Sequence, residues 1–297
     1  MTPTHPSRNA GLAEKLADHL ELTKPRITLM VVLTTGLGFL LGREGELSLG
    51  LLAATLVGTG LLSAGGSALN HFWERDTDAL MERTAGRPLP AGRLGAGWAL
   101  TFGLVIAVGG CSLLAIRVNL LTAGLGLLAF LSYVFIYTPM KKLTPLSTLV
   151  GAIPGALPPM MGWTAARDDL AAGAWILFGI LFLWQLPHFL AIAWLCREDY
   201  ARAGLPTLPV VEPDGRSTAR QALLWGVVLL PVSLSPVAIG LAGAPYLAGA
   251  TVLGVGFLVA CAAFSRAVSD RAARHLLLAS VIYLPAVLAV MAVDRLV

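Results

Sequence analysis

Long apolar segments alternate with short polar segments along most of the 297-residue chain. A helix of about 20 apolar residues crosses the hydrocarbon core of a bilayer. The pattern predicts nine such helices, at about residues 27–42, 49–70, 98–116, 120–137, 147–165, 174–195, 222–242, 245–264 and 276–293. We therefore expect an all-α fold, a polytopic membrane helix bundle in which residues 27–297 form one transmembrane domain.

Residues 1–26 form a polar N-terminal segment. Between Gly11 and Leu22, leucines recur among acidic and basic residues, a pattern typical of a short helix that lies at the membrane interface. The apolar run that follows is similar to the core of a signal peptide, but no small-residue cleavage site comes after it and a second span begins soon afterwards. We therefore interpret it as a retained first membrane helix.

The distribution of basic residues predicts the orientation. With nine spans and the N-terminus in the cytoplasm, only four of the 21 Lys and Arg residues lie outside: Arg43, Arg117, Arg167 and Arg295. Such a bias is typical of cytoplasmic loops. It places three polar connections, residues 71–97, 138–146 and 196–221, on the cytoplasmic face, and we expect the function there.

Composition excludes several classes of protein. A mean hydropathy of +0.76 is too high for an ordinary soluble domain. Cys111, Cys196 and Cys261 are far apart and predict neither a disulfide framework nor a zinc site. The net charge of +4 is explained by membrane topology. We therefore expect no nucleic-acid partner.

Residues 70–88 hold an unusual concentration of charge. Asn70, Glu74 and Asp78 recur every four residues and would share one face of a helix. Such oxygen ligands suit Mg²⁺, which is usually held by one or two carboxylates together with substrate phosphates. Three arginines in this stretch could bind the same phosphates through charge-assisted hydrogen bonds: Arg75, Arg83 and Arg87. The alternative is a solvated loop whose mixed charges keep the rim of the protein soluble.

The other two cytoplasmic connections also carry charge. Glu198 and Asp199 form a second acidic cluster, and Lys141 and Lys142 lie in the connection between the two clusters. Two acidic clusters at the mouth of an apolar bundle suit a substrate with a diphosphate head and a hydrocarbon tail. Mg²⁺ would stabilise the charge that develops on the leaving diphosphate, and the helices would keep water from a carbocation. This chemistry predicts prenyl transfer.

His188 lies inside an apolar stretch. Ionisable groups within a membrane span are rare and are candidates for function, and imidazole is a common ligand of haem iron. In the alternative, Pro187 frees a backbone carbonyl and His188 or Gln185 satisfies it. His71, beside the acidic face, is a second candidate.

Four separated motifs resemble those of the UbiA superfamily of intramembrane prenyltransferases and, within it, the protohaem IX farnesyltransferase (haem O synthase) branch. In chain order they are residues 22–26, 70–90, 137–142 with 155–163, and 184–206. The last motif joins Trp-Gln-Leu-Pro-His-Phe to Asp-Tyr-Ala-Arg-Ala-Gly-Leu-Pro. It is the most discriminating, because relatives that prenylate aromatic acids or quinone precursors do not usually carry it.

The resemblance implies a UbiA-type fold and transfer of the farnesyl group of farnesyl diphosphate to a vinyl group of haem B. Water adds in the same reaction, and the product is haem O for terminal oxidases. The cofactor it implies is Mg²⁺, and the location is a bacterial cytoplasmic (inner) membrane, in contact with lipid. An oxidase-assembly protein or a haem A synthase is the implied partner.

The resemblance also assigns roles by position. Asn70, Glu74 and Asp78 match the first Mg²⁺–diphosphate motif, and Asp199, with Glu198, matches the second; Asn70, Glu74, Asp78 and Asp199 are the catalytic candidates. The diphosphate is assigned to Arg75, Arg83, Arg87, Lys141 and Lys142, and the porphyrin or its iron to His188 and His71.

Two positions depart from the family pattern. Glu74 stands where an aspartate is more usual, and Ala203 stands where many relatives have a second acid. The second motif would therefore offer fewer metal ligands, unless Glu198 compensates. Two other functions stay open: a prenyltransferase of the same fold acting on a quinone precursor or chlorin, and a haem transporter or carrier.

Overall fold

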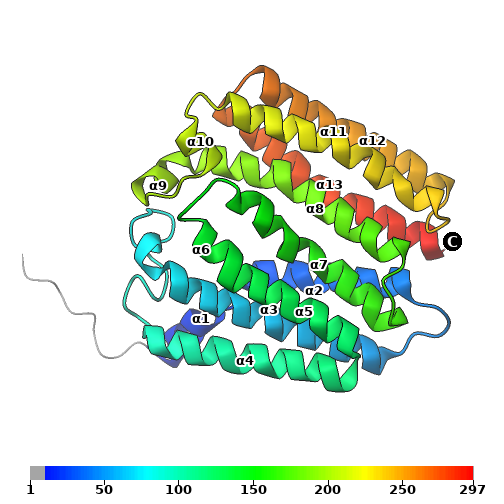
Figure 1. Cartoon of the computed structure of the whole chain (residues 1–297), viewed down its shortest axis with the longest axis horizontal. Coiled ribbons are helices and arrows are strands. Elements are labelled where there is room, and N and C mark those ends of the chain that lie inside the picture. The colour runs from blue at the N-terminus through cyan, green and yellow to red at the C-terminus, as the bar shows by residue number, and fades with distance from the viewer. Residues whose placement is uncertain (1–10, 297) are drawn as a thin grey trace, which may run out of the picture.

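The computed structural model describes residues 11–296, which form a bundle of long helices without a strand (Figure 1). The elements are α1 (Leu12–Leu22), α2 (Pro25–Gly42), α3 (Leu49–Asp78), α4 (Ala96–Arg117), α5 (Leu120–Leu131), the π-helix η1 (Ser132–Tyr137), α6 (Thr138–Met140), α7 (Ser147–Arg167), α8 (Ala172–Leu195), α9 (Arg197–Arg202), α10 (Leu208–Val211), α11 (Arg216–Ala238), α12 (Ala244–Arg266) and α13 (Asp270–Leu296). The predicted short helix before the first span is α1. Residues 1–10 of the predicted N-terminal segment, and Val297, lie outside the described residues.

Eight segments of the described chain are long and apolar enough to cross a membrane: α2, α3, α4, the continuous α5–η1–α6, α8, α11, α12 and α13. Each matches a predicted span. The ninth predicted span is α7, a helix of 21 residues whose three prolines and three glycines make it less apolar. The chain is therefore a multi-pass membrane protein. Helix α1 and the C-terminus lie at opposite ends of the bundle (Figure 1), as an odd number of crossings requires.

Two helices continue well beyond their predicted membrane spans. Helix α3 ends at Asp78 rather than near residue 70, and α11 begins at Arg216 rather than near residue 222. The reason is that hydropathy marks only the part of a helix that is in the hydrocarbon. A helix needs about 20 residues to cross it, whereas α3 has 30. Its last turns therefore extend beyond the membrane and carry polar residues with them.

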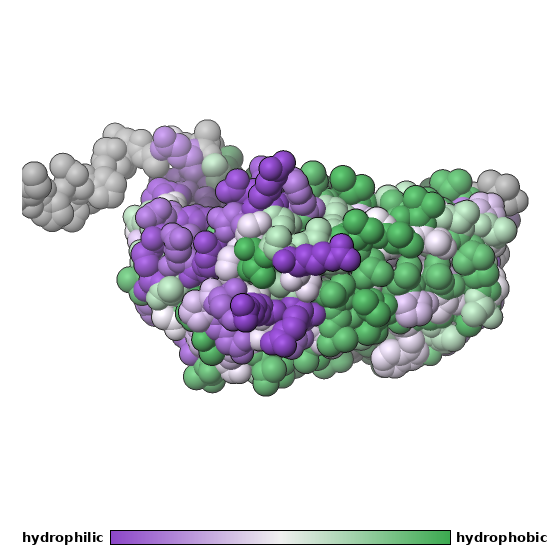
Figure 2. All heavy atoms as spheres, turned by 90° about the horizontal axis from the view of Figure 1, so that it is seen from above, coloured by the Kyte–Doolittle hydropathy of each residue, from purple (hydrophilic) through white to green (hydrophobic). Residues whose placement is uncertain are grey.

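Helices α7 and α8 are the centre of the bundle. Helix α7 packs against α2, α5 and α8, and α8 packs in turn against α11 and α13. Further close pairs are α2 with α3, α3 with α4, α4 with α5, α11 with α12, and α12 with α13. The connection after α3, the turn after α6 and the short helices α9 and α10 gather at one end (Figure 1). In the view of Figure 2, hydrophilic residues are concentrated at that end and apolar side chains cover most of the rest.

The backbones of α2 and α7 touch. A Cβ atom on Gly162 would lie 1.9 Å from the Thr35 carbonyl oxygen, and one on Gly38 would lie 1.9 Å from the Pro159 carbonyl oxygen. Helices in lipid associate through small residues that allow such an approach. The position of α2 against the centre of the bundle therefore depends on these two glycines.

We expect Gly162→Ala to lower the stability of the protein by about 1–3 kcal/mol, because the added methyl group forces two backbones apart. The measurement is thermal unfolding of the purified protein in detergent with lipid. The matched control is Gly256→Ala, a helical glycine whose Cβ would have no neighbour within 4 Å. Equal melting temperatures for the two variants would contradict the close packing of α2 and α7.

Candidate functional site

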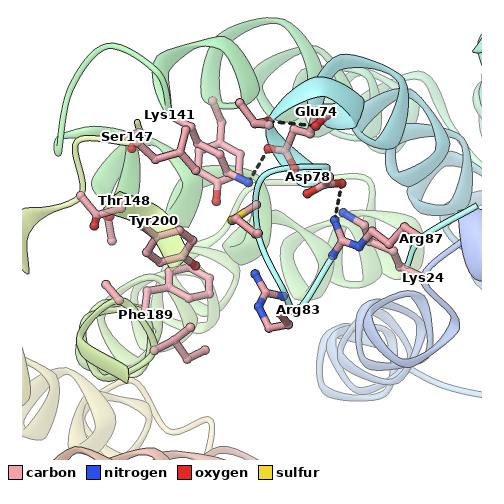
Figure 3. A pocket seen from close by; sticks show the side chains of 17 residues that line it. Lys24, Glu74, Asp78, Arg83, Arg87, Lys141, Ser147, Thr148, Phe189 and Tyr200 are labelled. Carbon is pink, nitrogen blue, oxygen red and sulfur yellow. Dashed lines mark hydrogen bonds and ion pairs between the residues drawn. The ribbon is translucent and has the colours of Figure 1, made fainter. Parts of the chain in front are cut away.

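Asn70, Glu74 and Asp78 lie on the last three turns of α3, and all three side chains are buried. Because α3 continues to Asp78, their spacing of four places them on a common face, as predicted. The ends of α3 and of the α5–η1–α6 segment meet here (Figure 3). Two carboxylates therefore lie one turn apart at the polar end of the bundle.

Each carboxylate is paired with a cation from another segment. Lys141 Nζ donates to Glu74 Oε1 at 2.7 Å, and Arg87 Nη1 donates to Asp78 Oδ2 at 2.6 Å (Figure 3). A carboxylate buried without a partner would be costly. These two pairs thus hold the connection after α3 and the turn after α6 against the end of α3.

Asn70 joins the same network. Its amide nitrogen donates to the Thr138 hydroxyl at 3.0 Å, and its amide oxygen accepts from Lys24 Nζ. Lys24 Nζ also lies 3.4 Å from the Tyr133 hydroxyl. The sequence motif of residues 22–26 contains Lys24, but sequence reasoning gave this lysine no role in the site.

The two buried lysines differ in their electrostatics. Burial, reinforced by Lys141 and Arg87, lowers the pKa of Lys24 to about 7, although Glu74 opposes the change. Burial alone would also lower the pKa of Lys141, but the adjacent Glu74 carboxylate raises it well above its usual range. Lys141 is therefore held firmly as a cation.

Lys141 also lies over the Tyr137 ring, 4.6 Å from its centroid. Tyr137 ends the π-helix η1 and stacks on Tyr133 with a centroid separation of 5.7 Å. Short π-helical segments are frequent at functional sites. Here the segment brings two tyrosines to the network around Lys141 and Lys24.

Of the side chains described above, six line a cavity of about 210 Å³: Lys24, Glu74, Asp78, Arg87, Tyr137 and Lys141. Four cations face two carboxylates in it: Lys24, Arg83, Arg87 and Lys141, against Glu74 and Asp78. When Lys24, whose pKa is about 7, is protonated, the excess of two positive charges favours an anion with several negative charges. Residues of the lining that sequence reasoning missed are Lys24, Thr77, Met81, Tyr137, Ser147, Thr148, Phe189, Ile192, Ala193, Tyr200, Leu205 and Thr207.

Seven predicted site residues do not line the cavity: Asn70, His71, Arg75, Lys142, His188, Glu198 and Asp199. Arg75 donates to the Phe72 carbonyl at 2.9 Å and lies 3.6 Å from Asp76. Lys142 and Glu198 are exposed. A role of these residues in binding diphosphate or metal stays a prediction.

Asp199 also lies outside the cavity lining. Its Oδ1 atom accepts from the Glu82 backbone N–H at 3.2 Å and from Arg202. Beside it, the connection after α3 and the segment after α9 share a small apolar cluster, made of Met81, Tyr200, Ala203 and Leu205. Asp199 therefore joins two connections at the edge of the cavity, and its part in a second metal motif stays a prediction.

The two candidate histidines lie apart from the cavity lining. His71 is buried, and no partner among the described residues bonds to either ring nitrogen. His188 Nδ1 lies 2.7 Å from Ser280 Oγ, and its ring stacks on Trp184 at 5.0 Å. When the Ser280 hydroxyl donates to the Leu277 carbonyl, as its geometry allows, Nδ1 donates to Ser280 and Nε2 of the neutral ring keeps its lone pair.

The carbonyl that Pro187 frees belongs to Leu183, four residues earlier. Gln185 donates to the carbonyls of Leu181, at 3.0 Å, and Ala152, at 3.4 Å, and His188 bonds to Ser280. Neither side chain satisfies the Leu183 carbonyl, so the structure contradicts the alternative in which His188 or Gln185 repairs the helix.

In the part of the chain that the structure describes, no group of three or more His, Cys, Asp or Glu side chains is placed to hold a metal ion. The pair on α3 nevertheless fits Mg²⁺, which needs only one or two carboxylates when substrate phosphates complete its shell. Asp78 Oδ1 is buried and has no hydrogen-bond partner among the described residues. The lone pairs of this oxygen are therefore free for a ligand.

A model of the UbiA prenyltransferase family matches residues 31–289. Curated relatives described as protoheme IX farnesyltransferases match nearly the whole chain. The relative from Solibacter usitatus is 48% identical over 94% of this chain and 99% of its own length. The relative from Koribacter versatilis is 46% identical over 96% of this chain and 95% of its own length.

Solved structures share the fold at lower identity. A digeranylgeranylglyceryl phosphate synthase has a TM-score of 0.81 at 19% identity, covering 95% of this chain and 99% of its own. A UbiA homologue from Archaeoglobus fulgidus, bound to GPP and Mg²⁺, has a TM-score of 0.65 at 16% identity, covering 92% of this chain and 99% of its own.

We expect Glu74→Gln to destabilise the protein by about 1–3 kcal/mol, because the partly buried Lys141, whose side chain is 26% exposed, would lose its carboxylate partner. Chemical denaturation in mixed micelles measures the loss. The double variant Glu74→Gln/Lys141→Met removes both charges and should recover most of it. A double variant as unstable as the sum of the single ones would contradict the coupling of this pair.

Proposed function

The chain belongs to the UbiA prenyltransferase family, and we propose that it transfers the farnesyl group of farnesyl diphosphate to a vinyl group of haem B, giving haem O. The observation that carries this proposal is the cavity at the end of α3, where two carboxylates and four cations converge. The near-full-length similarity to protoheme IX farnesyltransferases supports the acceptor.

The cations of the cavity suit the leaving group. Arg87 and Lys141 are bound to Asp78 and Glu74 in the structure, and both carboxylates are candidates to hold Mg²⁺. Mg²⁺, when bound there with the diphosphate, would neutralise part of the charge on the leaving group. Lys24, Arg83, Arg87 and Lys141 would stabilise the phosphate oxygens by charge-assisted hydrogen bonds.

The reaction needs no protein nucleophile. The bond between the allylic carbon and the diphosphate oxygen breaks, and its electron pair leaves with the diphosphate. The vinyl group of haem forms the new carbon–carbon bond, and water captures the resulting cation and loses a proton. The cavity of about 210 Å³ is smaller than a typical ligand pocket. It would take the diphosphate head, while the farnesyl chain and the porphyrin extend towards the apolar part of the bundle.

His188 is a suitable ligand for the haem iron. A histidine that binds a metal usually donates its other ring N–H to an acceptor, which fixes the tautomer. Ser280 is such an acceptor for His188 Nδ1, so Nε2 is free to approach haem iron. His71 stays a second candidate on its burial and unpaired ring nitrogens.

The distribution of basic residues bears on the orientation of the protein in the membrane. The four basic residues placed outside stand at the ends of α2, α4, α7 and α13, away from the cavity. This supports an orientation with the cavity on the cytoplasmic side, and the proposed location is a bacterial cytoplasmic membrane. A haem A synthase or an oxidase-assembly protein would receive the product.

We expect Asp78→Ala to lower the rate of haem O formation by about 100-fold or more, because it removes a Mg²⁺ ligand and the partner of Arg87. The assay combines purified protein in lipid, haem B, farnesyl diphosphate and Mg²⁺, and identifies the extracted haems by mass. The matched control is Asp76→Ala on the same helical turn, whose carboxylate is 75% exposed and paired with Arg75. EDTA should abolish the wild-type activity, and added Mg²⁺ should restore it.

The same assay separates the competing functions. Consumption of farnesyl diphosphate with a quinone precursor or chlorin alone would keep prenyl transfer and remove haem as the acceptor. Haem binding without consumption of farnesyl diphosphate would favour a haem carrier.

We expect His188→Ala to weaken haem B binding by about 10-fold and to change the Soret spectrum of the bound haem, because an iron ligand is lost. The matched control is His275→Ala, an exposed histidine near the start of α13. Retention of the wild-type spectrum in His188→Ala would exclude His188 as a ligand and leave His71→Ala as the variant to examine.

A further inference from the structure

The amphipathic helix α1 is bound to the connection that carries Arg83 and Arg87. Arg93 Nε donates to Asp18 Oδ1 on α1 at 2.9 Å, and Arg93 Nη1 donates to the Gly86 carbonyl at 3.0 Å. The third guanidinium nitrogen lies 3.8 Å from Glu21 Oε2. One planar guanidinium thus spans two segments through separate nitrogens, which a lysine cannot do.

This contact is more than a flexible surface pair. The Asp18 side chain is only 13% exposed, although Arg93 is 40% exposed. Arg93 is also fixed from its own backbone, because its N–H donates to the Pro88 carbonyl at 2.9 Å. Charge-assisted hydrogen bonds of this kind are stronger and more directional than solvated ion pairs.

Two further contacts hold α1 in place. The Trp98 indole donates to His19 Nε2 at 2.8 Å, while His19 Nδ1 lies 2.5 Å from the Lys15 carbonyl. Leu22 at the end of α1 is fully buried beside Ala68 and Leu89. Helix α1 therefore has a defined position beside α3, not only an affinity for the membrane surface.

The two segments that Arg93 joins, α1 and the connection after α3, each lead to a basic residue of the cavity. Lys24 follows α1 by two residues, in the left-handed region at φ 46°, and reaches Asn70. Arg87 follows Gly86 and reaches Asp78. A displacement of α1 relative to the connection would thus move two of the four cations of the cavity.

We propose that Arg93 is a positioning residue: by joining α1 to the connection after α3, it holds Lys24 and Arg87 in the arrangement that binds the diphosphate of the prenyl donor. The inference rests on the proposed function and deepens it. It gives the diphosphate site a determinant in α1, which precedes the region that the family model matches. Arg93 itself does not line the cavity.

The test is binding of inorganic diphosphate with Mg²⁺ to the full-length protein in lipid nanodiscs, by calorimetry, together with steady-state kinetics. We expect Arg93→Gln to weaken diphosphate binding and to raise the KM for farnesyl diphosphate by about 5- to 20-fold, as the loss of one charge-assisted contact implies. The kcat and the KM for haem B should change less than twofold. A general loss of structure would change the kinetic constants for both substrates, and not the KM for farnesyl diphosphate alone.

Variants of Asp18, the partner of Arg93, show whether the effect comes from the contact between these two side chains. Asp18→Asn should reproduce the effect, and Arg93→Gln/Asp18→Asn should be no worse than either single change, because both remove the same contact. Arg93→Lys keeps the positive charge but has one nitrogen in place of the separate guanidinium nitrogens that reach Asp18 and Gly86. This variant should bind diphosphate as weakly as Arg93→Gln. The control Arg216→Gln changes an arginine that is 81% exposed and lies outside this assembly.

The outcomes are distinguishable. Wild-type diphosphate affinity in folded Arg93→Gln, or in Asp18→Asn if Arg93→Gln does not fold, would overturn the positioning role and leave the proposed function intact. No diphosphate binding by the wild type would overturn the proposed function and its dependent inference together. Diphosphate binding without haem farnesylation would change only the acceptor.

Discussion

The pairing of buried carboxylates with cations from other segments is the interaction on which this end of the molecule depends. Helix α3 carries Glu74 and Asp78 beyond the apolar part of the bundle, where a buried charge without a partner would be strongly destabilising. Their partners, Lys141 and Arg87, come from the turn after α6 and from the connection after α3. The connections are therefore ordered by the same charges that are available to a substrate.

This arrangement explains how a small site can serve a large substrate. The cavity contains the charged groups, and its excess of cations matches a diphosphate. In the proposed reaction, Arg87 and Lys141 exchange a carboxylate for phosphate oxygens, so little reorganisation is needed when charge develops on the leaving group. The farnesyl chain and the porphyrin need no charged side chains of their own, because a helix bundle in lipid already offers them an apolar environment.

The framework behind the site is set by close backbone contacts. Gly38 and Gly162 let α2 and α7 touch, and α7 and α8 join the two halves of the bundle. Lys24 stands directly before α2, and Ser147 and Thr148 begin α7 at the edge of the cavity. The position of these polar residues thus depends on packing in the membrane as well as on the charges that they meet.

The pattern of apolar and polar residues was enough to predict the membrane-spanning helices and the common face of Asn70, Glu74 and Asp78. Both are local properties: apolar length decides whether a helix crosses lipid, and a spacing of four residues decides which side chains share its face. The charge of residues 70–88 and of the connection after α6 also indicated Arg83, Arg87 and Lys141, and the resemblance to family motifs assigned them the same role. Tertiary structure alone decided that Lys24 reaches Asn70, because 46 residues separate them. It also decided that Arg75 turns away from the cavity and that Asp199 bonds to the Glu82 backbone. Spacing along the chain does not specify these contacts, because they depend on which connections pack together after the helices have assembled.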